Sequence, residues 1–113
     1  MVVAIIGSRN CKKRIPEAWV PKSTTRIISG GARGTDRMAR IFALEHHILI
    51  HEILPDYRRY GRRAPLLRND EIIARADLVI AIWDGSSRGT RYVIDRCKTI
   101  GKPLMVYALQ DMD

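Results

Sequence analysis

Short apolar runs alternate along the chain with longer segments whose apolar residues have helical spacing. The apolar runs are rich in β-branched residues and predict buried strands over residues 2–6, 26–29, 48–54, 78–83 and 103–107. Helices are predicted between them over residues 16–20, 35–46, 69–76 and 89–100, with Thr35 and Asn69 as N-caps. This alternation predicts one α/β domain over residues 1–113 with a doubly wound parallel sheet. Residues 56–64 are predicted to form a polar loop, and the acidic tail 111–113 to fray.

Three glycine-containing loops follow predicted strands, at residues 7–9, 30–36 and 84–90. Their glycines leave the backbone accessible, and their hydroxyl and guanidinium groups suit phosphate or ribose. Because parallel strands with right-handed crossovers end at one edge of a sheet, we expect the loops to surround one site for a nucleotide-like anion. The candidate ligand-binding residues, including a pair beside the third predicted helix, are Gly7, Ser8, Arg9, Ser29, Gly30, Gly31, Ala32, Arg33, Gly34, Thr35, Asp36, Arg68, Asn69, Asp84, Gly85, Ser86, Ser87, Arg88, Gly89 and Thr90.

The second and third loops also have structural interpretations. The pattern Gly30-Gly31-x-x-Gly34 leads into a predicted helix, whose N-terminus attracts phosphate, but backbone geometry alone is a sufficient reason for such glycines. It is neither a Walker A motif nor the dinucleotide-binding fingerprint. Residues 86–90 are either a second phosphate cradle or a loop that caps a helix.

Individual side chains carry similar alternatives. Asp36 either binds a ribose hydroxyl or complements the helix dipole, and Ser29 either bonds the local backbone or contacts the ligand. Arg9 reaches the site if the first and fourth strands are neighbours. Asn69 is expected first as an N-cap, which leaves Arg68 to project toward the rim of the site.

The composition favours an anionic partner. The chain has 20 Lys and Arg against 12 Asp and Glu, a formal net charge of +8. A few convergent arginines suffice for a small anion, whereas nucleic acid requires a longer basic surface. The predicted loop 56–64 offers such a surface, in which two tyrosines are interleaved with arginines: Tyr57, Arg58, Arg59, Tyr60, Arg62 and Arg63.

Other classes of site and location have little support in the sequence. No apolar run approaches the roughly 20 residues of a membrane span, and residues 1–6 lack a basic leader, so we expect a cytoplasmic protein with no membrane partner. Cys11 and Cys97 are isolated and are predicted to be reduced thiols. With the three histidines they form no zinc-binding pattern, and we expect neither a metal nor a cofactor.

Taken together, the motifs resemble the SLOG superfamily, specifically its short YspA-like branch. The similarity covers nearly the whole chain and rests on Gly7-Ser8-Arg9, residues 29–36, Arg68-Asn69, Ala76-Asp77, residues 83–90 and Gly101-Lys102-Pro103. The resemblance implies a Rossmann-like sheet of strand order 3-2-1-4-5 and a pocket for nucleotides or NAD-derived molecules such as ADP-ribose. It also implies a homo-oligomer. The same superfamily includes DNA-processing protein A and the LONELY GUY phosphoribohydrolases.

The sequence departs from the phosphoribohydrolases at two positions. Val93 stands where they carry a catalytic glutamate, and Asp36 stands where they carry a methionine. Because the missing carboxylate would stabilise a developing oxocarbenium charge, we predict a module that senses or sequesters a nucleotide-derived ligand. Two alternatives stay open: hydrolysis of the N-glycosidic bond of nucleoside 5′-monophosphates, with Asp36 and Arg68 as catalytic candidates and Asp84 as a possible substitute carboxylate, and binding of single-stranded nucleic acid.

Overall fold

The computed structural model describes residues 1–112 and contains one parallel sheet of five strands. The strand order is β3-β2-β1-β4-β5, which confirms the predicted doubly wound α/β fold. Strands β1 and β4 are neighbours, with Ile5 opposite Ile80. The strands are β1 (Val2–Gly7), β2 (Arg26–Ser29), β3 (Leu49–Glu52), β4 (Leu78–Trp83) and β5 (Leu104–Ala108).

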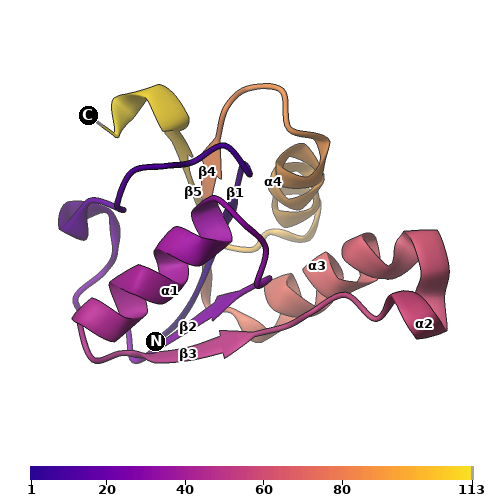
Figure 1. The fold of residues 1–113 in the computed structure, drawn as a ribbon, viewed down its shortest axis with the longest axis horizontal. Coiled ribbons are helices and arrows are strands. Elements are labelled where there is room, and N and C mark those ends of the chain that lie inside the picture. The colour runs from indigo at the N-terminus through magenta and orange to yellow at the C-terminus, as the bar shows by residue number, and fades with distance from the viewer. Residues whose placement is uncertain (113) are drawn as a thin grey trace.

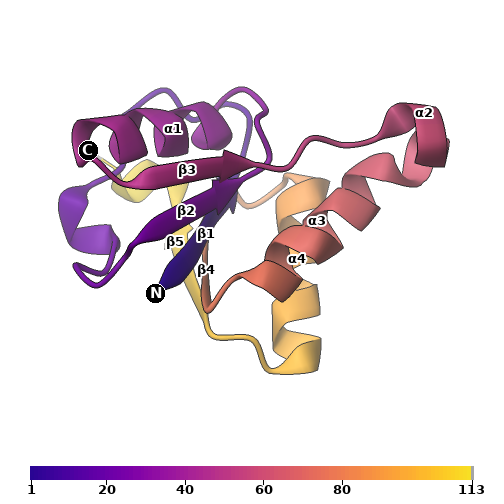
Figure 2. The ribbon, with the colours of Figure 1, turned by 90° about the horizontal axis from the view of Figure 1, so that it is seen from below.

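Helices cover both faces of the sheet (Figures 1 and 2). Helix α1 lies on one face and helices α3 and α4 lie on the other, while the short α2 projects away from the sheet. The helices are α1 (Thr35–Glu45), α2 (Tyr57–Tyr60), α3 (Ala64–Arg75) and α4 (Arg88–Ile100), and short 3-10 helices occupy Glu17–Trp19, Gly61–Arg63 and Leu109–Asp111.

Alternate residues of the central strands fill two cores. Val3 and Ile5 of β1 pack on the α1 side, together with Phe42. Ala4 and Ile6 pack on the opposite side, against α3 and α4. The apolar runs of β1 and β4 are therefore strands buried on both faces, whereas the edge strand β5 leaves Met105 and Val106 exposed. Cys11 and Cys97 are free thiols in different cores.

Two predicted N-caps are wrong, although α1 begins at Thr35 as predicted. The predicted loop 56–64 is helical, and α3 begins at Ala64 with Pro65 in its first turn, so that Asn69 lies inside the helix and caps nothing. Proline suits the first turn because its missing N–H has no intrahelical acceptor there. Gly34, not Thr35, is the N-cap of α1, because the Thr35 hydroxyl donates instead to the Ser8 carbonyl at 2.9 Å.

Several predicted boundaries also move. The strand predicted over 48–54 is limited to Leu49–Glu52, and the helix predicted over 16–20 is a single 3-10 turn. The predicted fraying of the tail is wrong for residues 111 and 112, because Met112 is buried against Cys11; Asp113 lies outside the described residues. Among residues 1–112, no helix combines the length and the apolar character needed to cross a membrane.

Candidate functional site

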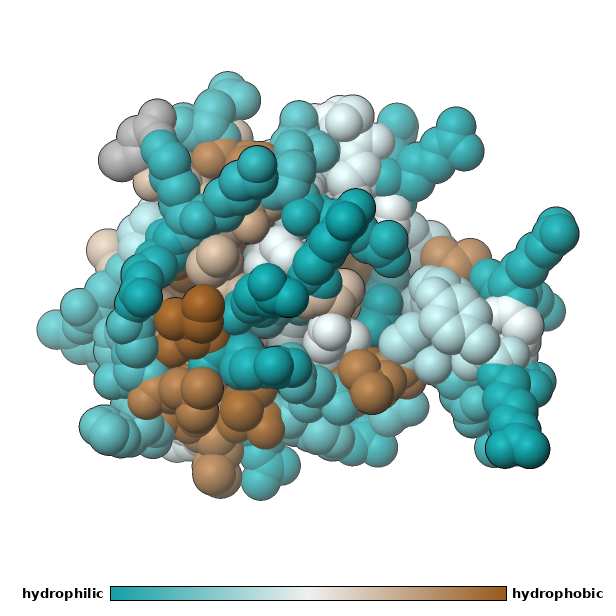
Figure 3. Space-filling model, in the orientation of Figure 1, coloured by the Kyte–Doolittle hydropathy of each residue, from teal (hydrophilic) through white to brown (hydrophobic). Residues whose placement is uncertain are grey.

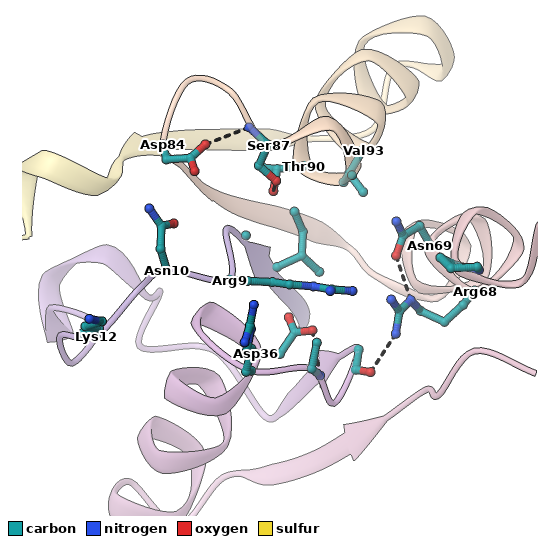
Figure 4. Close-up of a pocket in the computed structure, with 17 residues that line it drawn as sticks. Arg9, Asn10, Lys12, Asp36, Arg68, Asn69, Asp84, Ser87, Thr90 and Val93 are labelled. Carbon is teal, nitrogen blue, oxygen red and sulfur yellow. Dashed lines mark hydrogen bonds between the residues drawn. The ribbon is translucent and has the colours of Figure 1, made fainter. Parts of the chain in front are cut away.

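A cleft of about 690 Å³ opens at the carboxyl ends of β1 and β4. This is where strand order reverses, because the chain winds outward from β1 to β2 and from β4 to β5. Figure 4 shows the wall formed by Ser87, Thr90 and Val93 facing the wall that contains Asp36, with Arg9 extended between them. The cleft brings together twelve of the residues singled out in the sequence: Gly7, Arg9, Gly30, Ala32, Arg33, Asp36, Arg68, Asn69, Asp84, Ser87, Gly89 and Thr90.

The three loops converge because Ser8 joins them. Its hydroxyl accepts the Asp84 N–H at 3.0 Å, and its N–H donates to the Ile82 carbonyl at 2.9 Å. The Ser8 carbonyl accepts both the N–H and the hydroxyl of Thr35. Ser8 and Thr35 are fully buried and do not line the cleft, so their role is to hold the loops together.

Most of the loop glycines make room for protein atoms rather than for a ligand. A Cβ on Gly7 would lie 2.2 Å from the Ile82 carbonyl oxygen, and one on Gly34 would lie 2.5 Å from the Arg9 backbone. A Cβ on Gly30 would meet the Arg68 guanidinium at 2.6 Å. Gly89 is different, because it lines the cleft and a Cβ there would meet no atom within 4 Å.

The third loop leaves the N-terminus of α4 open toward the cleft. The Asp84 carboxylate accepts the N–H groups of Ser86 and Ser87 at 2.9 and 2.8 Å, and these bonds hold the pKa of Asp84 below its usual value. The N-cap residue of α4, Ser87, forms no side-chain capping bond within residues 1–112, and the first turn of the helix includes Gly89 and Thr90. The first N–H groups of a helix have no intrahelical acceptor, and they attract anions.

Three cations add to this positive end. Arg9, Lys12 and Arg33 line the cleft, and among residues 1–112 none of them forms an ion pair with a carboxylate. Their charges are therefore available to an anionic ligand. Arg9 has the most central place, and its charge also lowers the pKa of Arg68 by repulsion, behind the larger effect of burial.

Asp36 occupies the predicted phosphate cradle of the second loop. Its Oδ2 accepts the Ala32 N–H at 3.1 Å, and the Gly30 N–H also stabilises the carboxylate. Burial raises the pKa of Asp36, opposed chiefly by the Ala32 bond and then by Ser29 and Arg68. Since a carboxylate already fills this loop, a phosphate would meet repulsion here. The Asp36 side chain offers the cleft a hydrogen-bond acceptor instead.

Arg68 connects α3 to the ends of two strands. Its Nη1 donates to the Gly30 carbonyl at 2.7 Å and to the Ile53 carbonyl at 3.2 Å, and its Nε donates to Asn69 Oδ1 at 2.8 Å. Arg68 lines the cleft as expected, but most of its guanidinium is engaged by these acceptors. Burial lowers its pKa, although Asp36 opposes the shift. Its first role is to position the second loop.

The hydroxyl of Ser29 is a buried polar group without an ordinary partner. The residue is 0% exposed, and its Oγ forms no hydrogen bond of normal geometry within the described chain. It lies near the Asp36 carboxylate and helps to limit the rise in the pKa of Asp36. Ser29 does not line the cleft, so the predicted alternatives of a local backbone bond and a ligand contact both lack support in the geometry.

Four residues that line the cleft were not predicted from the sequence, and several predicted residues do not line it. Ile6, Asn10, Lys12 and Pro65 also line it, and Pro65 could have been found from its place at a helix start. Val93, at the position of the missing glutamate, lines it as well. The predicted residues outside the lining are Ser8, Ser29, Gly31, Gly34, Thr35, Gly85, Ser86 and Arg88.

Neither tryptophan lines the cleft. Trp83 packs beside the α3–α4 core and donates its Nε1–H to the Ser87 carbonyl at 3.1 Å, while Trp19 stacks on Tyr107. Within residues 1–112, no group of three or more His, Cys, Asp and Glu side chains is arranged to hold a metal ion.

The chain was compared with family models, curated proteins and solved structures, and none of these matches it.

Proposed function

We propose that the chain binds a phosphorylated nucleoside in this cleft, as a sensor or sequestering module. The observation that carries the proposal is the open, uncapped N-terminus of α4, which faces the Arg9 guanidinium across the cleft. Helix N–H groups and a guanidinium together form a strong site for a phosphate. The volume of about 690 Å³ is within the range of pockets for small ligands.

The uneven distribution of charge supports one orientation of the ligand. Thr90 lies on the wall away from Asp36, and the Asp84 carboxylate on that wall is engaged by the Ser86 and Ser87 N–H groups, so a phosphate there avoids the Asp36 carboxylate. The hydroxyl groups of a ribose would then lie toward Asp36, which can accept their hydrogen bonds. Ile6, Pro65 and Val93 supply apolar surface between the polar groups, suited to the face of a base or sugar.

Isothermal titration against AMP, ADP, ADP-ribose and cyclic AMP tests the proposal. Adenosine serves as the control because it keeps the base and ribose but lacks the phosphate. We expect at least one phosphorylated ligand to bind with a dissociation constant well below about 1 mM, which corresponds to about −4 kcal/mol, and adenosine to bind more weakly. If no phosphorylated nucleoside reaches that affinity, the proposal is wrong.

A second candidate function is hydrolysis of the bond between base and ribose. Asp36 favours it, because this carboxyl group lines the cleft and burial raises its pKa, as a general acid requires. Val93 leaves no carboxylate at the other wall, and the Asp84 carboxylate is engaged by the amides of its own loop. These two features favour binding over catalysis. Release of free base from nucleoside monophosphates, lost in Asp36→Ala, would reverse this ranking.

A further inference from the structure

We propose that a projecting arm, residues 56–63, binds single-stranded nucleic acid, independently of the ligand in the cleft. The arm consists of Asp56, α2 and the 3-10 helix Gly61–Arg63. Figures 1 and 2 show it extending beyond the sheet at the N-terminal end of α3. Helix α2 and the 3-10 helix Gly61–Arg63 pack mainly on each other and on α3. All residues of the arm are exposed.

The arginines of the arm are adjacent in the sequence and, among the described residues, unpaired. Arg58, Arg59, Arg62 and Arg63 are exposed, and in the described part of the chain none forms an ion pair with a carboxylate. Five arginines elsewhere are paired with carboxylates: Arg14, Arg40, Arg75, Arg91 and Arg96. The arm therefore carries four arginines without a carboxylate partner in residues 1–112, all within the six residues 58–63.

The acidic residue of the arm forms no ion pair with these arginines in the described part of the chain. Asp56 is used as a helix cap, and its side chain accepts the Arg59 N–H at 3.1 Å. Hydrophilic side chains extend outward from this end of the molecule (Figure 3). Four exposed arginines within six residues match a chain of phosphates better than they match a single small anion.

Two exposed tyrosines give the arm a surface for bases. Tyr57 and Tyr60 are 57% and 43% exposed, although aromatic side chains of this size are usually more buried. The Arg59 guanidinium lies 5.2 Å from the centre of the Tyr60 ring, so Tyr57 is the freer of the two. Aromatic rings between arginines are the arrangement that stacks bases while the backbone is held by charge.

A nucleic-acid strand fits this arm better than a membrane does. Its helical segments contain four and three residues, too few to form the apolar face of an amphipathic membrane helix. Single strands expose the faces of their bases, whereas duplexes conceal them, so the tyrosines favour a single strand.

Fluorescence anisotropy with labelled single strands of about 12 nucleotides, oligo-dT and oligo-rU, tests the proposal. The arm variant carries Arg58→Gln, Arg59→Gln, Arg62→Gln and Arg63→Gln. The matched control carries Arg14→Gln, Arg26→Gln, Arg75→Gln and Arg91→Gln, which removes the same charge from exposed positions outside the arm and the cleft. Circular dichroism and thermal melting show that both variants are folded.

We expect the arm variant to bind the strands at least about tenfold more weakly and the control to change less than about threefold. The logarithm of the wild-type affinity should fall against the logarithm of salt concentration with a slope of about −0.7 for each phosphate contacted, and the arm variant should flatten this slope. Tyr57→Ala should weaken binding about fivefold or more while leaving the salt slope unchanged.

Three results would overturn the proposal: no binding of either strand by the wild type, an equal loss in both quadruple variants, or arm-dependent binding of phosphatidylserine vesicles without binding of the strands. Titration of the arm variant with the nucleotides used for the cleft separates the two sites. Their affinities should stay at wild-type values, because no arginine of the arm lines the cleft.

Discussion

The Ser8 hydroxyl accepts the Asp84 N–H at 3.0 Å and so joins the loop after β1 to the loop after β4. The two residues are 76 positions apart in the sequence, and Ser8 is 0% exposed. The bond fixes where the third loop starts and, through it, where the open end of α4 faces the cleft. The cleft therefore depends on a residue that does not line it.

Replacing Ser8 with alanine should destabilise the fold. The Asp84 N–H would lose its acceptor, and a buried unsatisfied donor costs about 1–3 kcal/mol of unfolding free energy. Urea denaturation measures the change. Ser86→Ala is the matched control, because the Ser86 hydroxyl is exposed and lies 3.4 Å from Asp84; it should change stability by less than about 0.5 kcal/mol. Equal effects in the two variants would contradict this role of Ser8.

Arg9 and Arg88 should differ in their effect on ligand affinity, although both occur in predicted loops. Arg9 lines the cleft and Arg88 does not. Arg9→Gln should weaken binding of a phosphorylated nucleoside by about 10- to 100-fold, as expected for losing about 1.5–3 kcal/mol from a charged hydrogen bond. Arg88→Gln should weaken it less than about threefold, since it removes the same charge from a side chain that does not line the cleft. Titration calorimetry compares them, and a larger loss in Arg88→Gln would place the anion elsewhere.

Gly89→Ala should separate ligand binding from stability. A Cβ at this position has open space around it, so the fold should tolerate the substitution and gain up to about 1 kcal/mol from the helix propensity of alanine. The added methyl group should nevertheless hinder a ligand that approaches the start of α4. Thermal melting and titration calorimetry report the two effects. Unchanged affinity would show that no ligand approaches the backbone there.

Gly30→Ala provides the contrasting case. A Cβ there would lie 2.6 Å from Arg68 Nη1 and 2.8 Å from Asp36 Oδ2, so the half-buried Arg68 and the buried Asp36, which hydrogen bonds hold in place, would have to move. We expect a loss of about 1–3 kcal/mol in unfolding free energy. If Gly30→Ala melts at the wild-type temperature, the second loop is less closely packed than described.

Asp36→Asn should change the pH dependence of stability. Burial raises the pKa of Asp36 above its ordinary value of 3.8, so the folded protein binds this proton more tightly than the unfolded chain. Between pH 3.8 and the raised pKa, this group therefore lowers the wild-type unfolding free energy as pH rises, by at most about 1.4 kcal/mol per pH unit. The asparagine variant lacks this titration. Its unfolding free energy minus that of the wild type should increase with pH over that window and then level off.

Urea denaturation from pH 3 upward measures this difference, and Asp84→Asn serves as the comparison. Bonds from Ser86 and Ser87 lower the pKa of Asp84, so its contribution to stability is present above pH 3.8 and is lost as pH falls below that value. The two variants should therefore differ from the wild type in separate pH ranges. A difference for Asp36→Asn that decreases as pH rises would contradict the raised pKa.

The sequence by itself determined the order of strands and helices, because short apolar runs rich in β-branched residues, such as 78–83, favour a strand buried on both faces. Parallel topology then required the loops after β1, β2 and β4 to share one edge of the sheet, so Arg9 and Asp36 could be assigned to one site in advance. These inferences depend on local pattern and on the handedness of crossovers, both of which a sequence carries.

Only the tertiary structure decided which chemical groups of the loops face the cleft and which acceptor each hydrogen-bond donor already binds. The Asp36 carboxylate accepts a backbone N–H of the loop that was predicted to bind phosphate. Ser8 bonds to the neighbouring loops instead of a ligand. Of the glycines compared above, Gly89 alone lines the cleft with open space around it. The helical arm at 56–63 and the interior place of Asn69 were missed because Pro65, not Asn69, marks the start of α3. Hydrogen-bond partners distant in sequence compete for the same donor, and only their positions in space settle which one holds it.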